Sequence, residues 1–492
     1  MANHANGQGQ RAFLQKIAKR AMEDRGFQTS FPDAAVQALN KTGEKPITVS
    51  GAARDLRALA WCSIDNDDSE DLDQLSVAAI LPDKTVKILV AVADVDFVVK
   101  KDSPWEDHAR HNTTSVYTPA IIFPMLPEKL STDLTSLKFG ADRMAMVVEF
   151  IVQEDGSFRD PAIYPAAVNN KAKLAYNATG AWLEGKGPMP EAIKKVNGLE
   201  ENLRRQDEAA QKLKNLRYKG GALNLETIQS KPIFEGDDIR DLEEDIPNLA
   251  KEIIQEFMIC ANSITAKFLT SKNFPSFRRV VRVPKRWDRI VDLAAQSKYQ
   301  LPANPDSAAL DQFLRKAKAA DPVGFPDLSL TVIKLLGSGE YVVRYPGKEN
   351  PGHFGLALRD YTHSTAPNRR YPDLVTQRLL KAAIAASASP YKPEELDALA
   401  VQCTVMEDNA KKVERQVEKS AAALLLQSRV GQRFDSIVTG VSDKGTWVRI
   451  FHPPVEGKLV DGADGLDVGD RVSVKLVSTD AYRGFIDFRR IG

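Results

Sequence analysis

An acidic stretch, SIDNDDSEDLDQ at residues 63–74, carries the residue types best suited to chemistry. Six of the nine residues from Asp65 to Asp73 are acidic, and no Lys or Arg lies between Arg57 and Lys84. Like charges at this density repel one another unless water, a cation or distant basic groups compensate them. Carboxylate oxygens are the ligands that hard cations such as Mg²⁺ prefer. The stretch therefore predicts either a metal site or a solvated acidic turn.

The spacing of three aspartates favours a shared site. Asp71 and Asp73 lie two residues apart, so their side chains point to the same side of an extended segment. Asp65 can join them if the intervening residues fold back as a loop, which Asn, Ser and acidic residues favour. A calcium loop of the EF-hand type is excluded, because Glu70 stands where that loop has glycine and Ser76 where it has glutamate.

The surrounding sequence predicts the elements that hold these carboxylates. Residues 75–81 and 86–95 flank the turn PDKT and predict a β-hairpin whose second strand is largely buried. The spacing of apolar residues predicts helices over 189–215, 246–271 and 394–429. Mixed α and β sequence continues to about residue 385. The middle of the chain is therefore expected to form an α+β domain.

The two ends of the chain differ from this middle region. Residues 11–41 predict two amphipathic helices, which form either part of a helix-turn-helix or an arm that packs on the next domain. The C-terminal residues contain five short alternating strands between Gly and Asp turns, which indicates a small barrel of the oligonucleotide-binding type. Trp447 in this barrel offers a face on which a base can stack. Contact with another protein is the alternative role for such a barrel.

The overall composition restricts the class of protein. The chain has 492 residues, of which 43% are hydrophobic and 27% charged, and its formal net charge is +1. These values are typical of a soluble globular protein of several domains, so a nucleic-acid site has to be a local patch. Cys62, Cys260 and Cys403 lack zinc-ligand spacing and are expected to be buried thiols. Without a long apolar run or a secretory signal, we expect a cytoplasmic protein that contacts no membrane.

The acidic stretch and four later blocks resemble the ribonuclease II family of processive 3′→5′ exoribonucleases. The motif I-D-x5-D-L-D resembles the signature of the family's catalytic RNB domain. The later blocks follow in the family's order: TPAIIFPMLP with LSTDLTSL (118–137), NKAKLAYN (170–177), IIQEFMICAN (253–262) and HFGLALRDYTHSTAPNRRYPDL (353–374). The C-terminal strands, with GVSDKGTWV, VEGKL and GDRVSVK, resemble an S1 RNA-binding domain.

The resemblance implies four segments of the chain. These are a helical N-terminal region (1–50), an α+β RNB catalytic domain (51–388), a helical extension (389–429) and an all-β S1 domain (430–492). Bacterial members of the family carry two cold-shock barrels before the catalytic domain, whereas the preceding segment here is short and helical. We therefore expect a divergent form that lacks those barrels.

The resemblance also implies a reaction and its central residues. Asp65, Asp71 and Asp73 would hold Mg²⁺, with Mn²⁺ as a substitute, and the cation would activate a water for attack on the scissile phosphate. Arg369 would contact that phosphate, because its planar fork suits phosphate oxygens. The catalytic residues would thus be Asp71, Asp73 and Arg369. The substrate would be the 3′ end of single-stranded RNA, the products nucleoside 5′-monophosphates, and the protein a monomer.

Other residues of the blocks would contact the RNA. Tyr117 and Tyr176 match aromatic residues at the 3′-terminal nucleotide, where stacking tolerates every base. Glu256 is the expected contact to a 2′-hydroxyl, with a place on a helix face as the alternative. Arg370 and His363 would either hold backbone phosphate or pack the loop.

Several positions depart from the pattern of the family. Gln74 stands where the family has a fourth acid, with Asp67 or Asp68 as candidates to replace it, and Gln255 stands in place of the first acid of the I-E-E block. Two further changes, Ala366 and Asn368, are expected to alter loop packing more than chemistry. The departures leave two interpretations, an active divergent exoribonuclease or a catalytically weak or inactive RNA-binding regulator on the same fold. We favour the active enzyme, because the three aspartates and Arg369 are all present.

Overall fold

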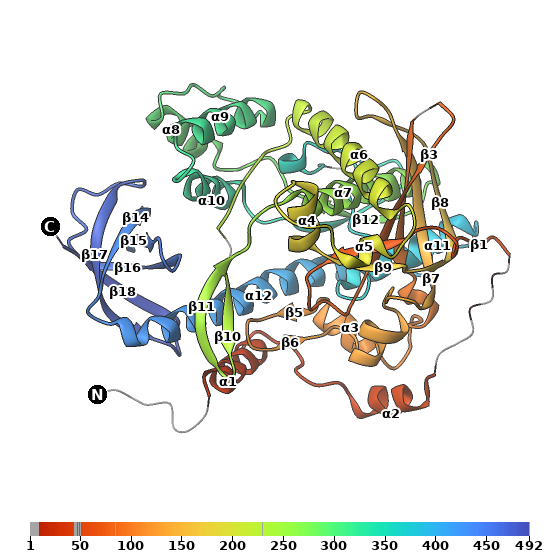
Figure 1. Ribbon diagram of the computed structural model, residues 1–492, viewed down its shortest axis with the longest axis horizontal. Helices are drawn as coiled ribbons and strands as arrows, with labels where there is room; N and C mark the ends of the chain where they lie inside the picture. Colours follow the sequence, from red (N-terminus) through yellow and green to blue (C-terminus); the bar gives the residue numbers. More distant parts are fainter. Residues whose placement is uncertain are drawn as a thin grey trace.

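The computed structural model describes residues 9–43, 47, 49, 51–83, 85–228, 230–349 and 351–491, and the statements below concern these residues. Its largest unit is an α+β domain on one seven-stranded sheet, and a long helix leads from there to a small β-barrel (Figure 1). The fold class predicted from the sequence is therefore confirmed. None of the described helices is long and apolar enough to cross a lipid bilayer.

The central sheet has the strand order β1-β8-β7-β4-β3-β2-β9. Its strands are β1 (Arg54–Asp55), β2 (Cys62–Asp65), β3 (Gln74–Ile80), β4 (Val86–Ala93), β7 (Asp142–Val152), β8 (Phe158–Asn169) and β9 (Ala172–Ala175). Strand β4 reads VKILVAVA and is buried over most of its length, because β-branched and apolar side chains let it pack on both faces. Strands β3 and β4 pair antiparallel and form the predicted hairpin.

Helices cover both faces of this sheet. On one face, α6 and α7 pack against β4 and β7, with Val90, Val148 and Phe257 in one apolar cluster. On the other face, Leu89 and Leu374 belong to a cluster that includes α11 and α12. These four helices are α6 (Leu199–Lys219), α7 (Leu249–Ser271), α11 (Tyr371–Ile384) and α12 (Pro393–Leu426).

One of the predicted helices, over residues 189–215, is interrupted in the structure. Helix α5 (Glu191–Lys194) ends before Gly198, and α6 begins directly after it. Gly198 has φ of +75°, a left-handed conformation that residues with a Cβ adopt only at a cost in free energy. The glycine therefore separates the two helices, whereas α7 and α12 correspond to the predictions over 246–271 and 394–429.

Shorter elements connect these layers, and some of them border the site described below. They are η1 (Val95–Phe97), α3 (Glu106–Asn112), β5 (Val116–Tyr117), β6 (Ile122–Phe123), η2 (Lys129–Leu134), α4 (Tyr176–Leu183), β10 (Ser230–Glu235), β11 (Asp238–Glu244), β12 (Ser276–Val280), α8 (Trp287–Gln296), α9 (Ser307–Ala320), α10 (Phe325–Leu336), β13 (Glu340–Arg344) and η3 (Phe354–Leu356). The β10–β11 hairpin contacts α12 and reaches down to the N-terminal helix α1 (Figure 1).

The N-terminal residues form the two predicted helices, α1 (Gln10–Glu23) and α2 (Asp33–Lys41). Helix α1 packs on α12, where Leu14 and Val413 share an apolar cluster. Helix α2 contributes Ala35 to the core of the large domain, and Trp105 Nε1 donates to Ala35 O at 3.0 Å. These contacts agree with the packing-arm interpretation of the N-terminal region.

The C-terminal residues form a closed barrel of five strands in the order β14-β15-β16-β18-β17, which confirms the predicted barrel. The strands are β14 (Arg433–Ser442), β15 (Gly445–Ile450), β16 (Val455–Asp461), β17 (Arg471–Asp480) and β18 (Phe485–Arg490), preceded by η4 (Gln427–Arg429). The end of α12 packs on the barrel core through Leu426 and Phe488. A buried ion pair of 2.7 Å between Arg449 Nη2 and Asp327 Oδ2 joins the barrel to α10.

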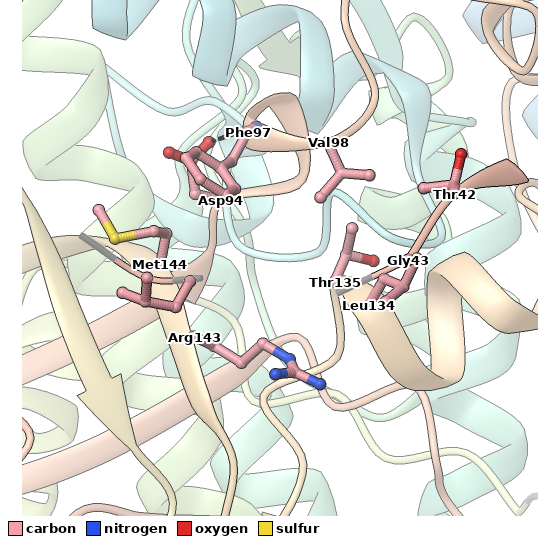
Figure 2. A pocket seen from close by; sticks show the side chains of 10 residues that line it. Thr42, Gly43, Asp94, Phe97, Val98, Leu134, Thr135, Arg143 and Met144 are labelled. Carbon is pink, nitrogen blue, oxygen red and sulfur yellow. Dashed lines mark hydrogen bonds between the residues drawn. The ribbon is translucent and has the colours of Figure 1, made fainter. Parts of the chain in front are cut away.

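A small cavity of about 30 Å³ lies between the N-terminal arm and the sheet. Figure 2 shows Thr42 and Gly43 on one side of it and Met144 and Arg143 on the other. Asp94, which also borders it, is ion-paired with Lys381 at 2.9 Å. The space admits water but no nucleotide, so we interpret it as a packing gap under the arm.

His108 joins the arm to the large domain and is buried without charge. The geometry assigns its Nδ1–H as donor to Gln28 Oε1 at 3.1 Å, and its Nε2 as acceptor from Asn112 Nδ2 at 3.2 Å. The ring also packs on Phe31 with 4.2 Å between ring centres. Burial, with a smaller contribution from His111, lowers the pKa of His108 to about 4.

Acidification is expected to destabilise the protein through His108. The unfolded chain binds more protons than the folded one between the two pKa values, so the free energy of unfolding falls as pH drops through about 6.5 and levels off near 4. At pH 5 this amounts to about 1–2 kcal/mol. Urea unfolding at pH 7 and pH 5 measures the loss, which should be smaller in His108→Gln than in the wild type. Exposed His452 supplies the control His452→Gln, and an equal loss in all three proteins contradicts the expectation.

Candidate active site

Most of the predicted site residues meet in one cavity of about 580 Å³, which we call the aspartate cavity. Its lining includes Asp65, Asp71, Asp73, Gln74, Tyr117, Tyr176, Gln255, Arg369 and Arg370. Most of these side chains lie at the ends of elements: Asp65 ends β2, Tyr117 ends β5, and Tyr176 begins α4. The fold therefore collects residues that are far apart in sequence at one edge of the sheet.

The acidic loop folds back as the spacing predicted. Asp65 Oδ1 accepts hydrogen bonds from Asn66 N at 2.7 Å and Ser69 Oγ at 3.0 Å, which turns the chain after β2. Asp71 Oδ2 accepts a hydrogen bond of 2.6 Å from the hydroxyl of Tyr117. All three predicted aspartates consequently line the same cavity.

Asp73 is the most buried of the three carboxylates, with 2% of its surface exposed. Its Oδ1 accepts a hydrogen bond of 2.9 Å from Asn368 N, and its Oδ2 lies 3.4 Å from Arg369 Nε. Burial raises the pKa of Asp73 to about 8, although the Arg369 charge acts in the opposite direction. Burial also raises the pKa of Asp65. The ionised form of Asp73 therefore needs more positive charge than Arg369 supplies.

The donor chemistry of the aspartate cavity fits a hard divalent cation. Asp73 Oδ2 is buried and accepts no hydrogen bond from any residue that the structure describes. Carboxylate and amide oxygens line the cavity together with this atom. However, no three His, Cys, Asp or Glu side chains of the described residues are gathered closely enough to hold an ion. The residues are of the right kind, but they do not form a closed ligand set.

Two arginines stand beside the carboxylates. The side chain of Arg369 is 43% exposed and lines both the aspartate cavity and a second cavity of about 220 Å³. Arg370 lines the same two cavities and is fixed by an ion pair of 2.6 Å to Asp373, which is fully buried. Arg369 thus keeps an accessible guanidinium, whereas Arg370 has a structural partner.

His363 does not line the aspartate cavity; contact with backbone phosphate and packing of the loop were its two expected roles. It borders the second cavity, where its Nδ1 lies 2.8 Å from the hydroxyl of Tyr341. Burial lowers the pKa of His363 well below its usual value, so the ring is neutral at pH 7. Its ring packs between those of Tyr341 and Tyr361, with centres 5.6 and 5.8 Å away. The packing alternative describes its position.

Glu256 also lies away from the aspartate cavity, in agreement with the alternative that it is a helix-face residue. It is 3% exposed and ion-paired with Arg217 of α6, with 3.0 Å between Arg217 Nε and Glu256 Oε2. Gln255 lines the aspartate cavity instead, because successive helical residues point about 100° apart. The sequence could have indicated this difference. Ile254, Met258 and Asn262 recur at helical spacing on the side of α7 that lines the cavity, and Gln255 belongs to that side whereas Glu256 does not.

The remaining predicted residues lie at the margin of the site or outside it. Asp67 and Asp68 are exposed, and Asp68 borders a third cavity of about 460 Å³ that adjoins the first. Trp447 is half-buried on β15 of the barrel, paired across the strands with Lys458. Gln74 itself lines the aspartate cavity, so an amide occupies the place of the fourth acid.

Asn368 is a functional residue that sequence reasoning missed. It is fully buried, its backbone N–H holds Asp73, and its side chain accepts a hydrogen bond from the hydroxyl of Thr135. A backbone donor leaves no trace in residue type, so no sequence signal could have identified this role.

Comparison with known families defines the class of protein to which this fold and site belong. Residues 53–386 match the model described as RNB domain, and residues 432–491 match that described as RNase II-type exonuclease C-terminal S1 domain. The chain therefore belongs to the RNB-domain family, with an S1 domain at the barrel.

Individual relatives agree with this assignment. The chain is 31% identical to Ribonuclease R of Vibrio parahaemolyticus, over 94% of this chain and 59% of the relative. It is 29% identical to Ribonuclease R of Escherichia coli, over 91% of this chain and 58% of the relative. The chain thus spans somewhat more than half the length of these relatives.

Solved structures share the fold at lower identity. The structure of Mycoplasma genitalium RNase R in complex with ribose methylated single-stranded RNA matches with a TM-score of 0.87 at 22% identity, covering 97% of this chain and 78% of that one. Yeast Ssd1, described as a pseudonuclease, matches with a TM-score of 0.71 at 17% identity, covering 94% and 57%. Because a pseudonuclease shares the fold, the fold alone does not show whether a protein is catalytically active. The chemistry of the site has to answer that question.

The position of Glu256 gives an expectation for stability. Glu256→Gln leaves the buried guanidinium of Arg217 without a carboxylate, so the free energy of unfolding should fall by about 3–5 kcal/mol. Glu208→Gln, which weakens an exposed pair with Arg205 on the same helix α6, should change it by less than about 1 kcal/mol. Denaturant unfolding measures both variants.

RNA affinity is the second readout of the same variant. Folded Glu256→Gln should bind single-stranded RNA as tightly as the wild type, because the side chain does not reach the aspartate cavity. A clear loss of RNA affinity without a loss of stability contradicts the structural role of Glu256.

Proposed function

We propose that this protein hydrolyses single-stranded RNA processively from its 3′ end and releases nucleoside 5′-monophosphates. The observation that carries the proposal is the buried Asp73 carboxylate, whose Oδ2 faces Arg369 at 3.4 Å in a cavity with two further aspartates. An anionic set beside an accessible guanidinium suits a phosphodiester bridged to a cation. The relatives named Ribonuclease R support the same reaction.

Mg²⁺, or Mn²⁺ in its place, is the cofactor we infer, held by Asp65, Asp71 and Asp73. When bound, such a cation lowers the pKa of a coordinated water and offsets the charge that develops on the phosphate. Asp73 supplies the least solvated ligand oxygen, and the N–H of Asn368 fixes the direction of its carboxylate. Pre-orientation of this kind stabilises a charged transition state without later rearrangement.

Arg369 is the residue we assign to the scissile phosphate. Its ion pair with Asp73 leaves the guanidinium partly exposed toward the cavity, so further N–H groups are available for phosphate oxygens. Asp73 therefore has two roles, as a cation ligand and as the group that orients Arg369. Arg370, fixed by Asp373, adds positive charge behind it.

Aromatic residues are assigned to the bases of the substrate. Tyr117 and Tyr176 both line the aspartate cavity, and stacking on a phenol ring accepts any base. Trp447, beside Lys458 on the barrel, is assigned to RNA farther from the 3′ end. This arrangement suits an enzyme that degrades RNA of any sequence.

Two neutral amides in the lining of the site favour a second candidate function, an RNA-binding regulator with weak or no catalysis. Gln74 and Gln255 stand where the family's pattern has acids, and both face the aspartate cavity. Fewer carboxylates mean a weaker attraction for divalent cations. For either function we propose a cytoplasmic monomer that binds single-stranded RNA.

Substitution of Asp73 tests the proposed reaction directly. Asp73→Asn keeps the shape of the side chain but removes its charge, so release of nucleotide monophosphates from 5′-labelled single-stranded RNA should fall by about 100-fold or more. Binding of the RNA should remain, because Arg369, Tyr117 and Tyr176 are unchanged. Equal products from both proteins, or none from the wild type, support the regulator.

Removal of the cation gives an independent check of the cofactor. Chelation with EDTA should abolish hydrolysis by the wild type, and excess Mg²⁺ or Mn²⁺ should restore it. Ca²⁺ serves as the comparison, because it takes more ligands at longer distances than Mg²⁺ does. Full activity in EDTA contradicts the proposed cofactor.

A further inference from the structure

Tyr117 makes one contact that base stacking does not require. Its hydroxyl donates to Asp71 Oδ2 at 2.6 Å, although the ring alone suffices for stacking. Tyr117 also lies where the three cavities meet, since it lines all of them. The hydroxyl therefore reaches a carboxylate that the proposed function assigns to the cation.

The partners of the other two carboxylates are of a different kind. Asp65 is held by groups of its own loop, and Asp73 by a backbone N–H that cannot rotate away. Asp71 is held by a side chain of β5, an element far from it in sequence. Asp65 and Asp73 each keep a backbone N–H as donor whatever the neighbouring side chains do, whereas the hydrogen bond of Asp71 to Tyr117 is lost when the tyrosine side chain changes rotamer.

The three carboxylates share a cavity without forming a ligand set. No group of three acidic, His or Cys side chains in the described part of the chain is close enough to hold an ion. Carboxylate ligands have to approach a divalent cation to about 2.0–2.6 Å. The hydrogen bond to Tyr117 fixes the direction in which Asp71 presents Oδ2, and in the same structure the three carboxylates do not form a ligand set.

We propose that Tyr117 is a latch: its hydroxyl holds Asp71 out of the cation site, and rotation of the side chain about its Cα–Cβ bond moves the ring away and releases the carboxylate to complete that site. Tyr117 is thus a positioning residue that acts through Asp71. The inference rests on the proposed function, because it needs a cation among the three aspartates.

The surroundings of Tyr117 permit this rotation without movement of the backbone. The N–H of Tyr117 donates to Glu414 Oε1 at 3.1 Å, and β5 pairs with β6 at Ile122. The residue is 36% exposed, and the second and third cavities adjoin it with about 220 and 460 Å³. The main chain is therefore fixed while the ring has space to move.

The latch couples the RNA to the cation. A base that stacks on the rotated ring stabilises the conformation in which Asp71 is free, so bound RNA strengthens cation binding. By linkage, the bound cation strengthens RNA binding by the same factor. The cation site is then complete only when substrate is present.

The experiment measures Mn²⁺ binding by electron paramagnetic resonance of the free ion, without RNA and without turnover. Tyr117→Phe removes the hydroxyl but keeps the ring, and it should bind Mn²⁺ about 5- to 10-fold more tightly than the wild type. Tyr176→Phe is the matched control, since that hydroxyl lies in the same cavity and makes no hydrogen bond to Asp71. It should bind as the wild type does.

A short 2′-O-methylated RNA supplies the second arm, with Mn²⁺ binding by the RNA alone subtracted. The RNA should tighten Mn²⁺ binding of the wild type several-fold and that of Tyr117→Phe much less. Equal or weaker Mn²⁺ binding by Tyr117→Phe, while the wild type hydrolyses RNA, overturns the latch alone. Failure of the wild type to bind Mn²⁺ even with RNA overturns the proposed cation site and the latch with it.

Discussion

The buried charge of Asp73 is the constraint on which the arrangement of the site depends. Asp73 is 2% exposed, and burial is the largest of the effects that together raise its pKa to about 8, so nearby positive charge is needed to favour its ionised form. The nearest partner is Arg369, whose guanidinium also faces the cavity. The single negative charge of Asp73 therefore both attracts a cation and orients the guanidinium of Arg369. The other site residues complete an environment in which that charge is stable.

The fold brings this environment together through the ends of its elements. The central sheet places Asp65 and Gln74 at one edge, and the turn before α11 adds Asn368 and Arg369. Helix α12 contacts the N-terminal arm, the β10–β11 hairpin and the barrel (Figure 1). It also lines the second and third cavities with Glu414 and Glu418. One long helix thus fixes the barrel relative to the site.

The sequence predicted the parts of the site that depend on local spacing. Asp71 and Asp73 face one cavity because alternate residues of an extended segment share a side, and Asp65 joins them because Ser69 folds the loop back. The α+β domain, the hairpin and the barrel follow from apolar periodicity in the same way.

The parts that sequence reasoning missed depend on contacts between distant segments. Glu256 lies on the side of α7 that faces α6, where it pairs with Arg217. His363 is enclosed by tyrosines from other segments, and the hydroxyl of Tyr117 meets Asp71 only in the folded chain. Such partners have no fixed spacing in sequence. Two misses could have been avoided from the sequence: the residue type of Gly198 indicates the left-handed turn that divides a predicted helix, and the helical phase of α7 separates Glu256 from the residues that line the cavity.

The most direct test of the central claim is the position of a cation in a crystal of the wild type grown with Mn²⁺ and a 2′-O-methylated RNA. Anomalous diffraction locates Mn²⁺ without reference to any assumed ligand. We predict a peak within bonding distance of Asp73 Oδ2, the buried oxygen that accepts no hydrogen bond from the described residues. RNA in the aspartate cavity with no Mn²⁺ peak at Asp73 would contradict it.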